Sequence, residues 1–319
     1  MMIDLLDERV ALKHDDHLVF NRDNVIDYLN HNQYLLSGFV IEEQAMNTMI
    51  YGYNHLGNPL KIGYFEGKIQ RIIVKTKNYS SKRVKLTISY DGSNYHGFQI
   101  QNNKKTIQGE LSKLVSEVNN HDVLVQGASR TDKGVHAHKQ IVHFDDASNL
   151  SPEDWKRFLN HRLNKDIYVK SVELVHPLFH SRYDVEKKEY VYKIKLGDYD
   201  PFLLRYTWHQ EYIDFVRLDD QLKKIIGKHD FKSFSKGAKD DTFRIIYDSG
   251  YKMDDEILEI HIIGNGFLRY MVRLLVSHCI NYATKKTNKD ILDIIKEKSR
   301  VSTKEMAPAS GLYLHNIFY

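Results

Sequence analysis

Gly127-Ala128-Ser129-Arg130-Thr131-Asp132-Lys133-Gly134-Val135-His136-Ala137 is the stretch from which the fold of the rest of the chain can be worked out. It lies between two apolar runs typical of strands, residues 123–126 and 140–144. We therefore expect Asp132 on a loop that a sheet holds at both ends, where a carboxylate can be directed at a ligand. The guanidinium of Arg130 could keep that carboxylate ionised or bind a phosphate.

The same stretch also fits an ordinary polar turn. Asp and Gly are common turn residues, and Arg is common on surfaces. Gly127 and Gly134 allow the backbone to turn tightly and, in a functional site, leave room for a ligand. The loop alone favours the plain turn, so the case for a site depends on the surrounding sequence.

Patterns on both sides of the loop predict a repeated unit. Residues 84–90 alternate as a strand, Thr106 precedes an apolar stripe at helical spacing, and Ser151-Pro152 open a second helix. With strands at 123–126, 140–144 and 167–174, the first half has the order strand, helix, strand, strand, helix, strand. This order is typical of a ferredoxin-like unit.

The second half repeats this order. We expect strands at 190–196, 243–253, 257–263 and 311–319, and helices at 216–227, 267–283 and 289–298. The predicted fold class is therefore α+β, with two tandem ferredoxin-like (βαββαβ) domains, 83–180 and 181–319, whose antiparallel sheets flank a central cleft. Because such a cleft is a common binding site, partners for Asp132 are expected in the second domain.

Residues 1–82 predict a small N-terminal appendage of unknown role. Short helices are expected at 24–30 and 41–49, and strands at 49–53 and 60–65. The polar residues 78–82 are typical of a linker to the rest of the chain.

Composition is that of a globular protein, with 42% hydrophobic and 28% charged residues in 319. The single cysteine, Cys279, excludes an internal disulfide and predicts a reducing, cytoplasmic location. The first ten residues carry acids where a signal peptide would be cationic. The apolar run 267–283 is interrupted by Arg269 and Arg273, so we expect no membrane span.

The charge distribution is compatible with a nucleic-acid partner. Residues 1–80 hold 8 Lys/Arg and 10 Asp/Glu, so the remaining residues hold 38 Lys/Arg and 32 Asp/Glu. Together with 21 Tyr and 14 Phe, this surplus provides cations and stacking rings. Many basic proteins bind no nucleic acid, so the surplus alone does not decide the partner.

Seven separated stretches together resemble the tRNA pseudouridine synthases of the TruA type, and they occur in the order of that family over residues 83–319. They are Tyr90-Asp91-Gly92 with Gly97-Phe98-Gln99, residues 129–137 with Val142-His143-Phe144, Phe179-His180-Ser181-Arg182-Tyr183, Lys188-Glu189-Tyr190-Val191-Tyr192, His229-Asp230-Phe231 with Ser233-Phe234, Gly264-Asn265-Gly266-Phe267-Leu268 with Met271-Val272-Arg273, and Gly311-Leu312-Tyr313-Leu314.

The resemblance implies a role for each matching residue. Asp132 matches the nucleophile of the family, Tyr190 the active-site tyrosine, and Arg273 the cation that pairs with the aspartate. Arg130 matches the arginine that displaces and binds the target nucleotide. Gly134 and Leu314, which lie in two of the matching motifs, are further substrate-binding candidates.

The chemistry of the reaction explains these residue types. Converting uridine to pseudouridine breaks an N-glycosidic bond, turns the base and rejoins it through carbon five. An ionised carboxylate can attack or abstract a proton, and a buried cation such as Arg273 would keep it ionised. The ring of Tyr190 can stack on a flipped base, and its hydroxyl can relay a proton. No cofactor or metal is expected, since the reaction is neither redox nor hydrolytic.

Alternatives remain at several positions. Tyr190 alone would more often be a core residue of a strand, whereas Arg273 on an apolar helix needs an anionic partner. His136, His138 and His143 could suggest a metal, but their spacing with acids is unconvincing.

We expect an isomerase that acts on a uridine in or near the anticodon stem-loop of tRNA. By resemblance, it would act as a homodimer with RNA lying across both subunits. A ribosomal RNA target is the second candidate, and a non-catalytic RNA-binding module of the same fold is the third.

Overall fold

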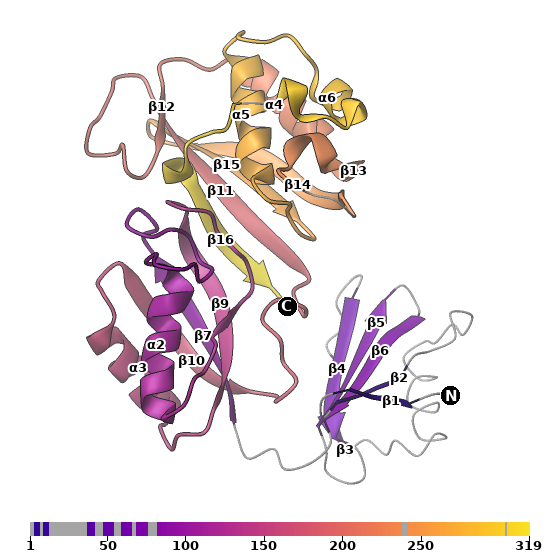
Figure 1. The fold of residues 1–319 in the computed structure, drawn as a ribbon. Helices are drawn as coiled ribbons and strands as arrows, with labels where there is room; N and C mark the ends of the chain where they lie inside the picture. Colours follow the sequence, from indigo (N-terminus) through magenta and orange to yellow (C-terminus); the bar gives the residue numbers. More distant parts are fainter. Residues whose placement is uncertain are drawn as a thin grey trace.

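The computed structural model of this chain describes residues 82–237, 241–303 and 305–319, together with six strands among the first 81 residues. These six strands form one antiparallel sheet (Figure 1). Its order is β1 (Ile3–Leu6), β2 (Arg9–Leu12), β6 (Lys68–Lys75), β5 (Pro59–Phe65), β4 (Asn47–Tyr53) and β3 (Ser37–Ile41).

The two strands predicted for the N-terminal part are confirmed as β4 and β5. The helix predicted over 41–49 is wrong at both of its ends, because Ile41 closes β3 and Met49 lies in β4. The β-favouring residues of β4, among them Ile50 and Tyr51, explain this outcome. Residues 42–46 and the helix predicted over 24–30 lie outside the described residues.

All other described strands belong to a second, large sheet. Its order is β10-β7-β9-β16-β11-β15-β14-β13, with β8 paired to β9 and β12 paired to β11. The strands are β7 (Lys82–Tyr90), β8 (Gln126–Gly127), β9 (His136–Asp146), β10 (Ile167–Val175), β11 (Lys187–Leu196), β12 (Trp208–Gln210), β13 (Gly227–Asp230), β14 (Phe243–Asp254), β15 (Ile257–Gly264) and β16 (Leu312–Phe318).

Five described α-helices accompany this sheet (Figure 1). In the first half, Thr106 and Ser151 cap their helices as predicted, each accepting a hydrogen bond from a backbone N–H of the first turn. The helices are α2 (Ile107–Asn119), α3 (Pro152–Arg162), α4 (Phe215–Lys224), α5 (Met271–Ala283) and α6 (Ile291–Glu297).

The strand predicted over 123–126 is mostly absent, and only Gln126 and Gly127 form β8. The reason is a local competition for hydrogen bonds. The N–H of Val123 donates to Ser116 Oγ over 2.8 Å, and that of Val125 donates to Ser112 Oγ over 3.0 Å. The serine hydroxyls of α2 therefore accept the backbone hydrogen bonds that a neighbouring strand would otherwise accept.

In the second half, α5 starts four residues later than predicted. Tyr270 adopts a left-handed conformation with φ 67° immediately before Met271, which breaks the helical path. The helix predicted over 216–227 likewise ends at Lys224, and Gly227 opens β13.

The two halves share one sheet, which corrects the prediction of two separate sheets facing a cleft. Strands β9 and β16 pair in parallel, with Tyr313 opposite His136 and Leu314 opposite Ala137. This pairing lies at the start of β9, directly after the loop that carries Asp132. The loop is therefore held where the two halves meet.

The N-terminal sheet contacts the body of the protein at the segment before β11. Lys61 of β5 forms a buried ion pair with Asp184, and the Tyr51 hydroxyl of β4 donates to the same carboxylate. The ring of Tyr51 also lies 5.1 Å from that of His176. Among the described helices, none has the length and apolar character needed to cross a membrane.

Candidate active site

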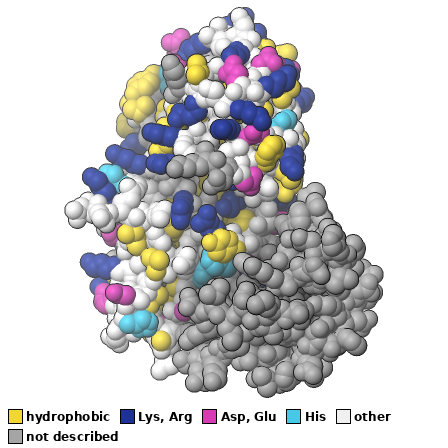
Figure 2. All heavy atoms as spheres, turned by 45° about the vertical axis from the view of Figure 1, so that its right-hand side comes forward, with side chains coloured by type: hydrophobic (Ala, Val, Ile, Leu, Met, Phe, Trp, Pro, Cys, Tyr) yellow, Lys and Arg dark blue, Asp and Glu magenta, His cyan; other side chains and the backbone are white. Residues whose placement is uncertain are grey.

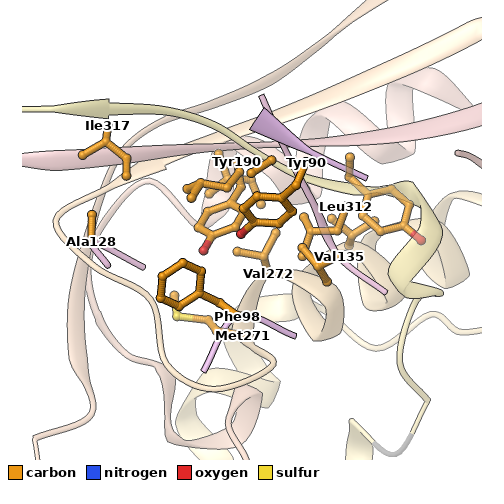
Figure 3. Close-up of a cluster of buried hydrophobic side chains, with 14 of the residues drawn as sticks. Tyr90, Phe98, Ala128, Val135, Tyr190, Met271, Val272, Leu312 and Ile317 are labelled. Carbon is orange, nitrogen blue, oxygen red and sulfur yellow. The ribbon is translucent and has the colours of Figure 1, made fainter. Parts of the chain in front are cut away.

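A pocket of about 640 Å³ lies between residues of the two halves. The first half contributes the loop residues 128–133, and the second contributes Tyr190 of β11 and the segment 267–273 at the start of α5. Figure 3 shows a cluster of buried apolar side chains that includes Tyr190, Met271 and Val272, all three of which also line the pocket. A pocket lined by both apolar and polar side chains suits a flat base with polar edges.

The backbone of the Asp132 loop is held from β9 by Gln140, which has 0% exposure. Its Nε2 donates to Ser129 O over 2.7 Å, and its Oε1 accepts from Ser129 N over 3.1 Å. The Tyr90 hydroxyl and Thr131 Oγ1, 2.8 Å apart, fix the next part of the loop. The loop is thus rigidly placed by buried polar side chains.

A backbone hydrogen bond that depends on Gly97 also supports the loop. Phe98 N donates to Thr131 O over 3.1 Å, and Gly97 has φ 91°. A Cβ at residue 97 would lie 2.6 Å from Thr131 O, so only glycine fits this approach.

Asp132 and Arg273 face each other in the pocket. Asp132 Oδ2 lies 3.9 Å from an Nη of Arg273, and the two side chains are 24% and 11% exposed. Arg273 Nε also donates to Ala307 O over 2.7 Å, which fixes the guanidinium. The structure therefore brings together two residues that the sequence places far apart.

Burial raises the pKa of Asp132, and the charges of Arg273 and Arg269 oppose this rise without cancelling it. The prediction that Arg273 favours the ionised carboxylate is right about the effect of Arg273 itself. The loss of hydration, which the sequence does not reveal, has the larger effect on this pKa.

Tyr190 is buried beside the loop. Its hydroxyl lies 2.8 Å from Ser129 Oγ, and its ring meets that of Phe267 edge-on at a centroid distance of 5.1 Å. Burial raises its pKa to about 12, and Asp132 adds to the rise. The phenol therefore stays protonated at neutral pH and can donate a hydrogen bond.

Of the remaining predicted site residues, Arg130 lines the pocket, whereas Gly134 and Leu314 do not. Arg130 is exposed and lines the pocket. Gly134, with φ 78°, makes the turn after Asp132 and is not part of the pocket wall. Leu314 is fully buried in β16, and it is Leu312, two residues earlier, that reaches the pocket.

Sequence reasoning missed several residues of the site. Gln140 and Ser129 hold the loop, Lys188 lines the pocket from β11, and Tyr270 lines it in its left-handed conformation. The alternation of β11 could have found Lys188, since residues two apart on a strand share a face and Tyr190 was already a candidate.

The three histidines considered as metal ligands each contact an aromatic ring or a hydroxyl group instead. The rings of His136 and His138 stack on Tyr313, at 4.8 and 5.0 Å between centroids, and His143 Nδ1 lies 2.8 Å from Ser181 Oγ. Within the part of the chain that the structure describes, no three His, Cys, Asp or Glu side chains are grouped to hold a metal ion.

The comparisons with known proteins all match tRNA pseudouridine synthases. A family model described as tRNA pseudouridine synthase matches residues 86–184 and 222–319. The tRNA pseudouridine synthase A of Geobacillus sp. (strain WCH70) is 40% identical over 245 residues, which cover 75% of this chain and 99% of the relative. Those of Anoxybacillus flavithermus and Maridesulfovibrio salexigens are 37% and 35% identical, covering 75% of this chain and 99% and 90% of the relatives.

Proposed function

The chain belongs to the tRNA pseudouridine synthase family, and from this premise we propose that Asp132 is the residue that starts the isomerisation of uridine to pseudouridine in tRNA. The observation that carries the proposal is the position of Asp132, half-buried in a pocket and facing Arg273. A carboxylate at such a site can attack the sugar or remove a proton from it. Both routes require the ionised form.

Arg273 and Tyr190 have complementary parts in this proposal. Arg273 stabilises the charge of Asp132. The hydrogen bond from Arg273 Nε to Ala307 O holds the guanidinium in place for this role. Tyr190 offers its ring to the displaced uracil, and its protonated hydroxyl can pass a proton. Arg130, at the exposed rim of the pocket, is placed to contact the nucleotide as it leaves the stack.

The finer parts of the proposal concern target and assembly. We place the target uridine in or near the anticodon stem-loop and the protein in the cytoplasm as a homodimer, all from the family resemblance. Exposed apolar side chains between β11 and β12, such as Phe202 at 88% exposure, support a protein contact there. Light scattering that finds a monomer at working concentrations would exclude the homodimer.

We also propose that residues 83–180 and 181–319 are two ferredoxin-like domains and that residues 1–82 are a separate appendage. The support is that both halves have the same strand order. It is β10-β7-β9-β8 in the first half and β16-β11-β15-β14 in the second.

Replacing Asp132 by Asn tests the proposal. We expect pseudouridine formation in a tRNA transcript to fall by about 10⁴-fold or more, since the amide is neither a nucleophile nor a base. RNA affinity should stay close to that of the wild type. Asp255→Asn is the matched control, because Asp255 is exposed in the β14–β15 turn with φ 55°, a conformation that Asn tolerates.

Mapping pseudouridine in tRNA and rRNA from cells with and without the gene identifies the target. Loss of a site in the anticodon stem-loop is the expected result. Loss confined to rRNA would contradict the tRNA assignment, and residual turnover by Asp132→Asn would contradict the role of Asp132.

A further inference from the structure

The charges that line the pocket are strongly unbalanced. Among its described lining residues, Asp132 is the single carboxylate, and Arg273 already faces it. Figure 2 shows Lys and Arg side chains in a band across the described part of one face of the protein. The Lys and Arg residues that line the pocket are Arg130, Lys133, Arg182, Lys188, Arg269 and Arg273.

Lys188 is a half-buried cation of this set that has a single hydrogen-bond acceptor among the described residues. It lies on β11 and reaches the same pocket as Tyr190, and its Nζ donates to Ala128 O over 2.7 Å. Within the described chain, this carbonyl is its hydrogen-bond acceptor, and no carboxylate lies within 4.0 Å of it. Two of the three ammonium protons therefore have no acceptor among the described residues.

The surroundings of Lys188 disfavour its charge. Burial lowers its pKa to about 8, and the nearby guanidinium groups of Arg182 and Arg244 lower it further. Arg244 has Asp241 as a partner at 3.4 Å. A bound anion would reverse both effects, because it would replace lost hydration and offset the repulsion.

Arg182 supplies a second cation that lines the pocket, and it is near enough to Lys188 to lower the pKa of that ammonium. It is exposed, and its guanidinium carbon lies 5.7 Å from the centre of the Tyr183 ring. Among the described residues it has no carboxylate partner. A planar guanidinium beside an ammonium is a favourable arrangement for phosphate oxygens.

We propose that Lys188 and Arg182 bind a backbone phosphate of the RNA next to the target uridine. The proposal rests on the function proposed above, because it places the RNA chain beside the pocket that takes the base. Ala128, which holds Lys188, directly precedes Ser129, which holds Tyr190. An anchored phosphate would therefore have a fixed position relative to the ring on which the uracil stacks.

The salt dependence of RNA binding tests this site. In the Asp132→Asn background, which separates binding from turnover, we would measure the Kd for a tRNA transcript at several salt concentrations. Lys188→Gln and Arg182→Gln should each weaken binding by about tenfold and lower the slope of log Kd against log salt by about 0.7 to 0.9, the value for one lost phosphate contact. Glutamine at 188 keeps a donor for Ala128 O while removing the charge.

Lys187→Gln is the matched control. Lys187 precedes Lys188 on β11, and its Nζ lies 5.0 Å from the centre of the Phe318 ring, outside the pocket. Its replacement should leave the slope unchanged. The protein that keeps Lys188 should bind a transcript with one neutral methylphosphonate beside the target uridine less tightly than the unmodified transcript. The Lys188→Gln protein should bind the two transcripts with equal affinity.

Unchanged salt slopes in both Lys188→Gln and Arg182→Gln, with wild-type melting temperatures, would overturn the phosphate site. Lys188 would then only tie the loop to β11. Turnover of the same transcript by the wild-type protein is a separate readout. If it forms no pseudouridine, the proposed function fails, whereas the binding slopes still decide the phosphate site.

Discussion

The chemistry proposed for Asp132 requires its ionised form, whereas its burial favours the neutral form. Its pKa is raised in the folded protein, so its neutral form contributes stability in acid. This contribution is lost as pH rises through the unfolded value towards the folded one, and the ionised group opposes folding at neutral pH. Since the proposed chemistry requires the ionised form, the fold tolerates an unfavourable charge at the point where it is needed.

Arg273→Met should move the acidic limb of the pH–activity profile to higher pH. Arg273 lowers the pKa of Asp132, so its removal lets burial raise that pKa further. The check is kcat/KM as a function of pH for the wild type and the variant. Arg273→Lys, which keeps the charge, should leave the limb near its wild-type position. An identical limb in Arg273→Met would show that Arg273 does not control the ionisation of Asp132.

At the scale of elements, the active-site loop depends on strand β9, which lies next to it in the sequence and beside it in space. Gln140 of β9 pairs with both backbone groups of Ser129, as a neighbouring strand would. Ser129 in turn holds the Tyr190 hydroxyl on β11. A change within β9 can therefore alter the site without touching the substrate.

Gln140→Ala should lower both stability and turnover. Leaving the Ser129 backbone unpaired should cost about 1–3 kcal/mol of unfolding free energy, and kcat should fall by about tenfold as the loop loosens. Gln221→Ala is the matched control. Gln221 also has 0% exposure and accepts from Ile291 N over 2.8 Å, away from the pocket. It should lose comparable stability with kcat unchanged, and equal losses of kcat in both variants would contradict a specific role for Gln140.

Element prediction succeeded where the determining contacts are local. The caps at Thr106 and Ser151 involve residues within one turn of each helix, so the sequence displays them directly. It failed at 123–126, where two serines of α2 capture the strand's backbone donors. It also failed at the start of α5, where the left-handed Tyr270 ends the helical path at a position that the sequence pattern does not mark.

At the scale of the whole molecule, the pocket and its large sheet are formed without the N-terminal sheet. All described lining residues lie between His96 and Leu312. The Geobacillus relative matches over 99% of its own length but over only 75% of this chain. The N-terminal part meets the body through Lys61 and Asp184, and neither of these residues lines the pocket.

Deleting residues 1–81 should leave pseudouridine formation in tRNA unchanged. The reason is that the residues proposed to act on uridine, and the strands that hold them, all follow residue 81. The measurement is kcat/KM on tRNA transcripts, together with the set of modified sites in cells. A narrower set of sites would show instead that the appendage extends the RNA contact surface.

The sequence by itself determined the capped helices, most strands and the family, because these depend on short-range patterns and on motifs that can be read in order. It also indicated Asp132, Tyr190 and Arg273 as candidates, through resemblance. Only the tertiary structure decided that β9 and β16 join the halves into one sheet, that Leu312 rather than Leu314 reaches the pocket, and that burial outweighs Arg273 in setting the pKa of Asp132. These outcomes depend on how segments distant in sequence pack and exclude water, which no local pattern of residues specifies.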